Sequence, residues 1–110
     1  MTVNDIKEQL SLEVAAGADG LSKEVSGCYI GDLLSLAMSR VQKSNVWITI
    51  QTNVNIVAVS VLTEGACVIL CDSQKPDEIA TNKANMEDVP LLLSDKSAYE
   101  LASKLSALGI

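Results

Sequence analysis

The sequence predicts an α/β fold, in which helices cover both faces of a mainly parallel sheet of about five strands to form a three-layer sandwich. Short apolar, strand-like runs alternate with helical patterns along the chain, without an internal repeat or a low-complexity stretch. The run over residues 66–71 is apolar at every position, which is typical of a central parallel strand with both faces covered. The length of 110 residues suits a single domain spanning residues 1–110.

The first part of the chain predicts a helix, two strands and a second helix. Thr2 can cap a helix over residues 3–10, and residues 12–15 then have an extended pattern. Residues 25–30 are expected to form another short strand. Asp32 follows as a natural N-cap for a helix whose sheet-facing side should contain Leu33, Leu34, Ala37, Met38 and Val41.

The middle of the chain predicts the centre of the sheet, with strands at residues 46–50 and 66–71. The segment between them, residues 54–62, is rich in β-branched side chains, and propensity alone would allow a strand and a hairpin. A parallel connection requires a crossover, however, and that crossover is usually a helix. We therefore predict a helix, with a packing face made of Val54, Val57, Ala58, Val61 and Leu62.

The last part of the chain predicts helix, strand and helix. Pro76 suits the first turn of a helix that runs to about residue 86, and residues 91–93 form a short strand. Ser97 and Glu100 make a capping box for the final helix. Its buried stripe is expected to contain Leu101, Ala102, Leu105 and Leu108.

Composition and charge exclude several classes of function. Eight basic residues against fourteen acidic ones give a net charge of −6, and no basic cluster offsets it locally, so nucleic acid and anionic membranes are poor partners. The N-terminus lacks the basic start and apolar core of a signal peptide, and no apolar run approaches the roughly 20 residues of a membrane span. We expect a cytoplasmic protein.

The residues that usually perform catalysis or bind metals are scarce. The three cysteines, Cys28, Cys67 and Cys71, are an odd number in apolar surroundings, which favours buried reduced thiols over a disulfide framework. Histidine, the usual imidazole ligand and general base, is absent. We therefore expect no catalytic residues, no metal and no cofactor, and a redox role for the cysteines is the distant alternative.

Polar residues follow the predicted strands at their carboxyl ends, where open α/β sheets bind ligands. The most informative group lies between two apolar runs and has amides and a hydroxyl but no charge. The predicted ligand-binding residues are Asp32, Gln51, Thr52, Asn53, Asn55, Asp72 and Ser73. The alternative interpretation is that these side chains cap helices and fasten loops, because the same residue types serve as caps.

A homodimer is expected because the helix predicted at residues 54–62 is apolar around much of its circumference. Ile56 and Val59 lie off the predicted packing face, and Trp47 lies on the opposite face of its strand from its apolar neighbours. A two-fold interface made by these three residues would remove the apolar surface from water. The alternatives are that the N-terminal helix covers this surface and that Trp47 packs in the core.

Three stretches resemble the DRTGG domain family: VSGCYIGDLLSLAM, VWITIQTNVNIVAVSVLTEGACVILCDSQKPDE and VPLLLSDKSAYELASKL. The resemblance covers residues 25–108 and is strongest to small stand-alone members found near iron–iron hydrogenase genes. Where other members have Gly-Asp-Arg, this chain has Gln51, Thr52 and Asn53. Where they have Thr-Gly-Gly, it has Cys71, Asp72 and Ser73.

The resemblance implies a regulatory or assembly module associated with a hydrogenase-related partner. Together with the expected dimer and the lack of catalytic residues, this predicts a non-catalytic homodimeric module. Some relatives are attached to kinase domains, but this chain has no G-x-x-x-x-G-K-[ST] phosphate loop. The alternative function is a sensor that binds a nucleotide-like small molecule at the carboxyl ends of the strands.

Overall fold

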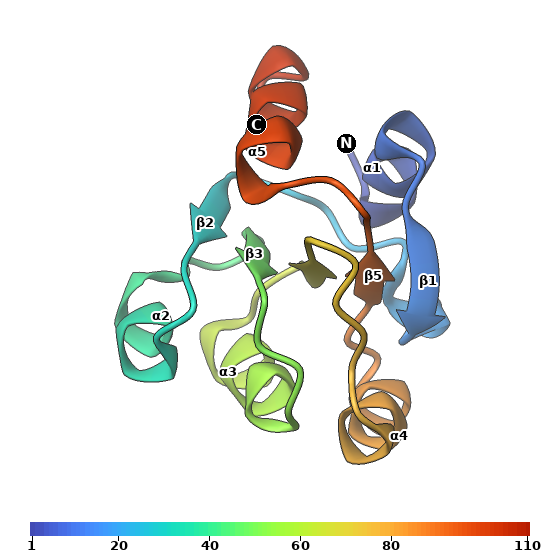
Figure 1. Cartoon of the computed structure of the whole chain (residues 1–110), viewed down its shortest axis with the longest axis vertical. Helices are drawn as coiled ribbons and strands as arrows, with labels where there is room; N and C mark the ends of the chain where they lie inside the picture. The colour runs from blue at the N-terminus through green and yellow to red at the C-terminus, as the bar shows by residue number, and fades with distance from the viewer.

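The computed structural model describes residues 1–110 and contains one five-stranded sheet in the order β1-β5-β4-β3-β2 (Figure 1). Four neighbouring strands are parallel, and only the edge strand β1 runs antiparallel, against β5. The mainly parallel sheet predicted from the sequence is therefore confirmed. Its strands are β1 Glu13–Ala16, β2 Cys28–Ile30, β3 Val46–Thr49, β4 Cys67–Leu70 and β5 Leu91–Leu93.

Helices lie on both sides of the sheet, as the sequence predicts. In Figure 1, α1 and α5 lie on one side, and α2, α3 and α4 lie on the other. No helix has both the length and the apolar character needed to span a membrane. The helices are α1 Val3–Leu10, α2 Leu34–Arg40, α3 Asn55–Thr63, α4 Glu78–Glu87 and α5 Ala98–Ala107, with a short 3-10 turn at Ala18–Gly20.

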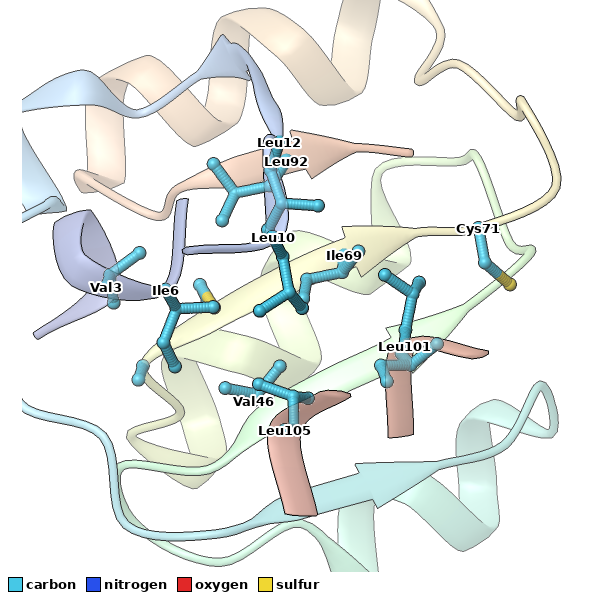
Figure 2. Packing of buried hydrophobic residues seen from close by; sticks show 13 residues of the cluster. Val3, Ile6, Leu10, Leu12, Val46, Ile69, Cys71, Leu92, Leu101 and Leu105 are labelled. Carbon is cyan, nitrogen blue, oxygen red and sulfur yellow. The ribbon is translucent and has the colours of Figure 1, made fainter. Parts of the chain in front are cut away.

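Two apolar clusters, one on each face of the sheet, make up the core. On the first face, side chains of α1 and α5 meet those of the strands; Figure 2 shows Ile6, Leu101 and Leu105 among them. On the second face, α3 packs against Trp47 and Val68 of the central strands. Alternation along β3 explains the division, because Val46 and Ile48 belong to the first cluster whereas Trp47 belongs to the second.

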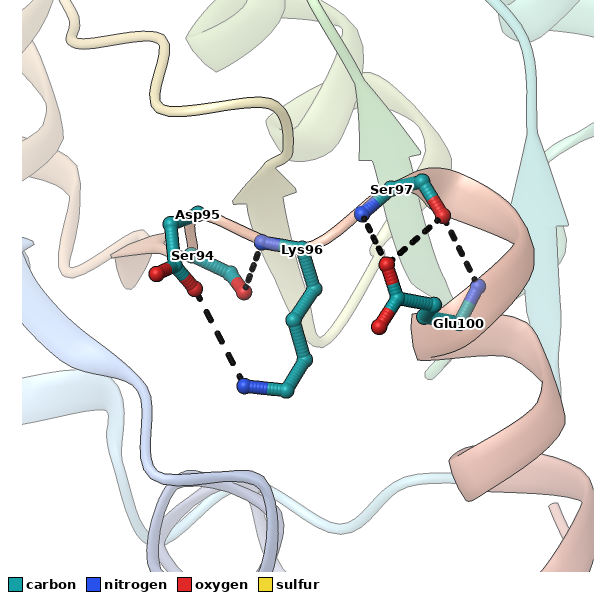
Figure 3. A network of polar contacts seen from close by, with 5 residues as sticks. All are labelled: Ser94, Asp95, Lys96, Ser97 and Glu100. Carbon is teal, nitrogen blue, oxygen red and sulfur yellow. Dashed lines mark hydrogen bonds and ion pairs between the residues drawn. The ribbon is translucent and has the colours of Figure 1, made fainter.

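Local capping sets where several helices begin. Thr2 and Asp5 form a reciprocal capping box at α1. Ser97 and Glu100 form another at α5, which Figure 3 shows from close by. Asp77, rather than Pro76, is next to the start of α4, and its carboxylate accepts a hydrogen bond from the backbone N–H of Ala80. Each cap satisfies an amide that the helix itself leaves unpaired.

The prediction that Trp47, Ile56 and Val59 form a dimer interface is wrong. All three are buried within the chain, and none is more than 2% exposed. Trp47 also donates a hydrogen bond from Nε1 to the Gly31 carbonyl oxygen at 2.9 Å. The buried residues of α3 are Ile56, Val57, Val59 and Ser60, whereas Ala58, Val61 and Leu62 face outward. The helix itself is confirmed, but its orientation about its own axis is not the predicted one.

Helix α2 buries less of its surface than predicted. Ala37 and Val41 are buried, but Leu33 and Met38 are 64% and 49% exposed. The reason is the position of β2 at the edge of the sheet, which leaves α2 with a neighbouring helix, α3, on one side only. The N-cap of α2 is Leu33, so Asp32 is not the helix cap that the sequence suggested.

Candidate functional site

Asp32 joins the ends of two parallel strands. Its Oδ1 accepts one hydrogen bond from the Thr49 hydroxyl and one from the backbone N–H of Ile50, both at 2.9 Å. Thr49 is only 1% exposed, so its hydroxyl would otherwise be buried without this partner. The carboxylate therefore fixes the loop after β2 to the end of β3. Thr49, the hydrogen-bond partner of Asp32, was not predicted from the sequence, although it is the single polar residue within β3.

Gln51 and Asn53 continue this network along the loop that leads into α3. Gln51 Nε2 donates to the Asp32 carbonyl oxygen at 2.8 Å, and Asn53 Nδ2 donates to Gln51 Oε1 at 3.2 Å. Asn53 Oδ1 accepts from the backbone N–H of Asn55 at 2.9 Å, which satisfies the first amide of α3. Asn55 is exposed. The amides thus fasten the loop, as the alternative interpretation expected.

Asp72 and Ser73 form a second group at the end of β4. Both residues have left-handed backbone conformations, with φ of 55° and 61°. Their N–H groups donate to the carbonyl oxygens of Lys96 and Ser94, each at 2.9 Å. These bonds turn the loop toward β5. Non-glycine residues seldom occupy this region of backbone space, and two in succession require support of this kind from the surrounding structure.

A shallow hollow of about 330 Å³ lies beside this second group, bounded by the loop after β4, the end of β5 and the start of β1. Of the predicted binding residues, only Ser73 lines it. Ser94 and Asp95 line the hollow as well, and Figure 3 shows them beside Lys96, whose ammonium lies 3.8 Å from Asp95 Oδ1. The hollow is polar, and its lining also contains Gln74 and Lys75, which follow Ser73 in the loop after β4.

The two groups both lie at the carboxyl ends of the parallel strands, but they do not form a single crevice. The backbone N–H of Asp77 donates to the Thr52 carbonyl oxygen at 3.0 Å, which brings the two loops together. Cys71 lies between them, with Sγ 3.7 Å from the Thr49 carbonyl oxygen and 3.7 Å from Asp72 Oδ2. The structure therefore divides the predicted site into a fastened loop at β3 and an open hollow beside β4.

The cysteine thiols are poor nucleophiles in this setting. Burial, followed by the negative charge of Asp72, raises the pKa of Cys71 above its ordinary value. Burial raises the pKa of Cys67 to about 12. Cys28, on the edge strand β2, is exposed, so the prediction of a buried thiol is wrong there, although partial burial raises its pKa to about 11. Because the thiolate is the reactive form, these raised pKa values disfavour nucleophilic attack by the thiols at neutral pH.

The fold is similar to that of a solved regulatory protein. The chain superposes on the CBS and DRTGG domains of the regulatory region of Clostridium perfringens pyrophosphatase, complexed with its activator diadenosine tetraphosphate, with a TM-score of 0.74. The two are 9% identical, and the match covers 94% of this chain but 45% of the other, so this chain spans less than half of that protein.

No curated protein matches the sequence. The DRTGG domain model matches residues 5–108, which is nearly the whole chain and extends beyond the resemblance at residues 25–108. Together with the parallel sheet and its two layers of helices, this match shows that the chain belongs to the DRTGG domain family.

Proposed function

We propose that the chain is a non-catalytic regulatory or assembly module that works as a homodimer in the cytoplasm, where its three free thiols stay reduced. Family membership supports the regulatory role, because the structurally similar pyrophosphatase segment is a regulatory region. The raised thiol pKa values and the use of Asp32 as a loop fastener argue against chemistry at the strand ends.

The observation that carries the proposal is that most of the large exposed apolar side chains come from one part of the chain, around β2, α2 and α3. Seven of the eleven large exposed hydrophobic residues lie between residues 30 and 62, on β2, α2, α3 and the end of β3. This is more apolar exposure than a small monomer normally leaves in one region. The seven residues are Ile30, Leu33, Leu36, Met38, Ile50, Val61 and Leu62.

The charge distribution supports a second copy of the chain as the partner. Residues 25–42 contain one acid, Asp32, and one base, Arg40, whereas the chain as a whole has a net charge of −6. Two copies that meet along β2 and α2 therefore bring together nearly neutral surfaces. The acidic residues of the rest of each chain stay away from those of the other copy. A two-fold axis at a sheet edge is compatible with the common symmetry of homodimers.

Light scattering coupled to gel filtration tests this interface. The wild-type chain is expected to elute as a dimer at micromolar concentration, and Leu33→Glu should produce a monomer because it places a charge on the apolar surface. Ile79→Glu is the matched control, since Ile79 is 67% exposed on α4, outside this region. A wild-type monomer, or equal behaviour of the two variants, would count against the dimer.

The resemblance to stand-alone domains encoded near iron–iron hydrogenase genes supports a partner from such a system. The same pair of variants provides the test: tagged wild type and Ile79→Glu should recover a hydrogenase-related protein from native extract, and Leu33→Glu should recover less. Recovery of no such protein by the wild type would contradict this association.

The second candidate function is a sensor of a nucleotide-like molecule. It is favoured by the left-handed pair Asp72 and Ser73 beside the open hollow, and by the nucleotide activator bound to the pyrophosphatase region. Calorimetric titration with diadenosine tetraphosphate and with AMP tests it. Binding that is lost in Ser73→Ala and kept in Asn55→Ala, whose side chain is exposed outside the hollow, would support a sensor site; absence of binding would exclude these ligands.

A further inference from the structure

A cleft of about 390 Å³ lies at the opposite end of the sheet from the strand-end loops. It is bounded by the C-terminal ends of α3 and α4, by the residues that precede β4 and β5, and by the segment around Lys23. This volume falls within the roughly 300–1,000 Å³ of small-molecule sites. The cleft is separate from the apolar surface of the proposed dimer except at Val61, which borders both.

The electrostatics of the cleft favour a cation. Glu24, Glu64 and Glu87 line it, and Lys23 is the one basic residue among them. The Lys23 ammonium already donates to the Asp88 carbonyl oxygen at 2.7 Å. Helices α3 and α4 both end here, and the last turn of neither contains a basic residue. The partial negative charge at the C-terminus of α3 thus lacks the cation that usually accompanies it, whereas Lys23 supplies one at the C-cap of α4.

A hydroxyl that makes no hydrogen bond within the chain faces the same cleft. Ser60 is 3% exposed and lines the cleft, and its hydroxyl takes part in none of the hydrogen bonds of the chain, in contrast to the Thr63 hydroxyl, which bonds the Val59 carbonyl oxygen at 2.8 Å. No fully covered side-chain oxygen in the protein lacks a partner, so the Ser60 oxygen must reach the cleft surface. A buried hydroxyl in that position is available to a ligand.

Gly65 keeps this hydroxyl uncovered. A Cβ at Gly65 would lie 3.3 Å from Ser60 Oγ, and the backbone of Gly65 is not in the left-handed region. The left-handed residue at the end of α3 is instead Glu64, with φ of 57°. Glycine usually occupies that left-handed position. Here it stands one residue later, where the missing side chain leaves space in the cleft.

We propose that this cleft binds a small aliphatic di- or polyamine. No three acidic or thiol groups of the chain are close enough together to hold one metal ion, so the separated carboxylates suit a ligand with separated ammonium groups. Val61 and Val89 supply apolar wall for the methylene chain, and the Ser60 hydroxyl accepts from one ammonium. The ion pairs of Glu24 with the N-terminus and Glu87 with Lys83 are exposed, and weak enough for a ligand to replace.

Calorimetric titration of the full chain with spermidine at low salt tests the proposal. One equivalent should bind. Glu64→Gln and Ser60→Ala should each weaken binding about tenfold, the effect of losing one charge-assisted hydrogen bond. Gly65→Ala should weaken it without changing charge, because the added methyl group narrows the cleft at Ser60.

The matched control for charge is Glu8→Gln, which removes an exposed carboxylate of α1 outside the cleft and should bind spermidine like the wild type. Thermal melting of each variant shows that it is folded. Absence of binding by the wild type would overturn the proposed site. Equal weakening in Glu8→Gln and Glu64→Gln would also overturn it, because spermidine would then be attracted by the overall negative charge and not by the cleft. The oligomeric state, measured on the same samples, reports separately on the proposed dimer.

Discussion

Asp32 holds two loops together with a single carboxylate oxygen, which accepts from Thr49 and from the backbone of Ile50. This role differs from the helix cap that its sequence position suggested. An acidic side chain directly after a strand can accept from the next strand as readily as from the following helix, and the choice depends on which donor lies nearer. At the residue scale, the strand-end polar groups act mainly as structural fasteners.

Replacing Asp32 by Ala should lower the free energy of unfolding by about 1–3 kcal/mol, because the buried Thr49 hydroxyl and an amide lose their acceptor. Asp32→Asn keeps one acceptor oxygen and should cost less. Urea denaturation measures both. Asp95→Ala is the control, since the Asp95 side chain is 83% exposed and should matter by less than about 0.5 kcal/mol. Equal losses for Asp32→Ala and Asp95→Ala would refute the fastening role.

The buried thiol of Cys67 predicts a pH dependence of stability. Its pKa is about 12 in the folded chain against 9.0 ordinarily, so the unfolded chain releases this proton first as the pH rises. The free energy of unfolding is therefore independent of the titration of this thiol below pH 9. Between pH 9 and 12 it should fall as the pH rises, by up to about 1.4 kcal/mol per pH unit. Urea denaturation at pH 8 and pH 10.5 should show a larger loss for the wild type than for Cys67→Ala. Parallel losses would contradict it.

At the element scale, two backbone segments approach each other closely where the end of β1 meets the end of α4. Gly17 follows β1 with φ of +72°, and its N–H donates to Asn85 Oδ1 of α4 at 2.8 Å. A Cβ at this position would lie 1.9 Å from the Val89 carbonyl oxygen. The absence of a side chain at Gly17 therefore permits the antiparallel edge strand to meet the end of α4.

Gly17→Ala should destabilise the fold by about 3 kcal/mol or more, because the left-handed backbone and the collision with Val89 both oppose it. Gly109 offers a matched control. It has φ of +87°, but a Cβ there would meet nothing within 4 Å, so Gly109→Ala should cost only about 1 kcal/mol. Thermal melting of the two variants separates the contact from the conformational strain; similar melting temperatures would show that the contact is unimportant.

At the scale of the whole molecule, the two core clusters share one sheet, so neither layer of helices has an independent core. Trp47 lies near the centre of the second cluster, with 1% of its surface exposed and its indole N–H bonded to Gly31. The surface, by contrast, is uneven: apolar residues gather over β2 and α2, and acidic groups gather at the amino end of β4 and β5.

Unfolding should therefore be a single cooperative transition. Trp47 is the only tryptophan, so its fluorescence should be blue-shifted in the native chain and should shift to the red in urea. The midpoint should coincide with that measured by circular dichroism, as two-state unfolding requires. A tryptophan transition at a lower urea concentration than the loss of helix would show that the α2–α3 layer separates first.

Several features of this protein were determined by the sequence by itself, because their causes are local. The capping box of Ser97 and Glu100 depends on residues three apart, and the apolar run at residues 66–71 identifies the central strand wherever the other elements lie. The helix at Asn55–Thr63 was also predicted, from topology and not from local propensity, since two parallel strands require a crossover between them. These elements, and the family, could be read without the structure.

Only the tertiary structure decided which side of that helix is buried. Because α3 is apolar on nearly every side, periodicity cannot select a face, and its packing between α2 and α4 buried Ile56 and Val59 and left Val61 and Leu62 outside. The tertiary structure likewise decided the partners of the residues at the strand ends. Asp32 accepts from Thr49 of β3, and Ser73 donates to the carbonyl oxygen of Ser94, directly after β5. The physical reason is the same in both cases: burial and pairing depend on contacts between residues distant in the chain, which the spacing along the chain does not encode.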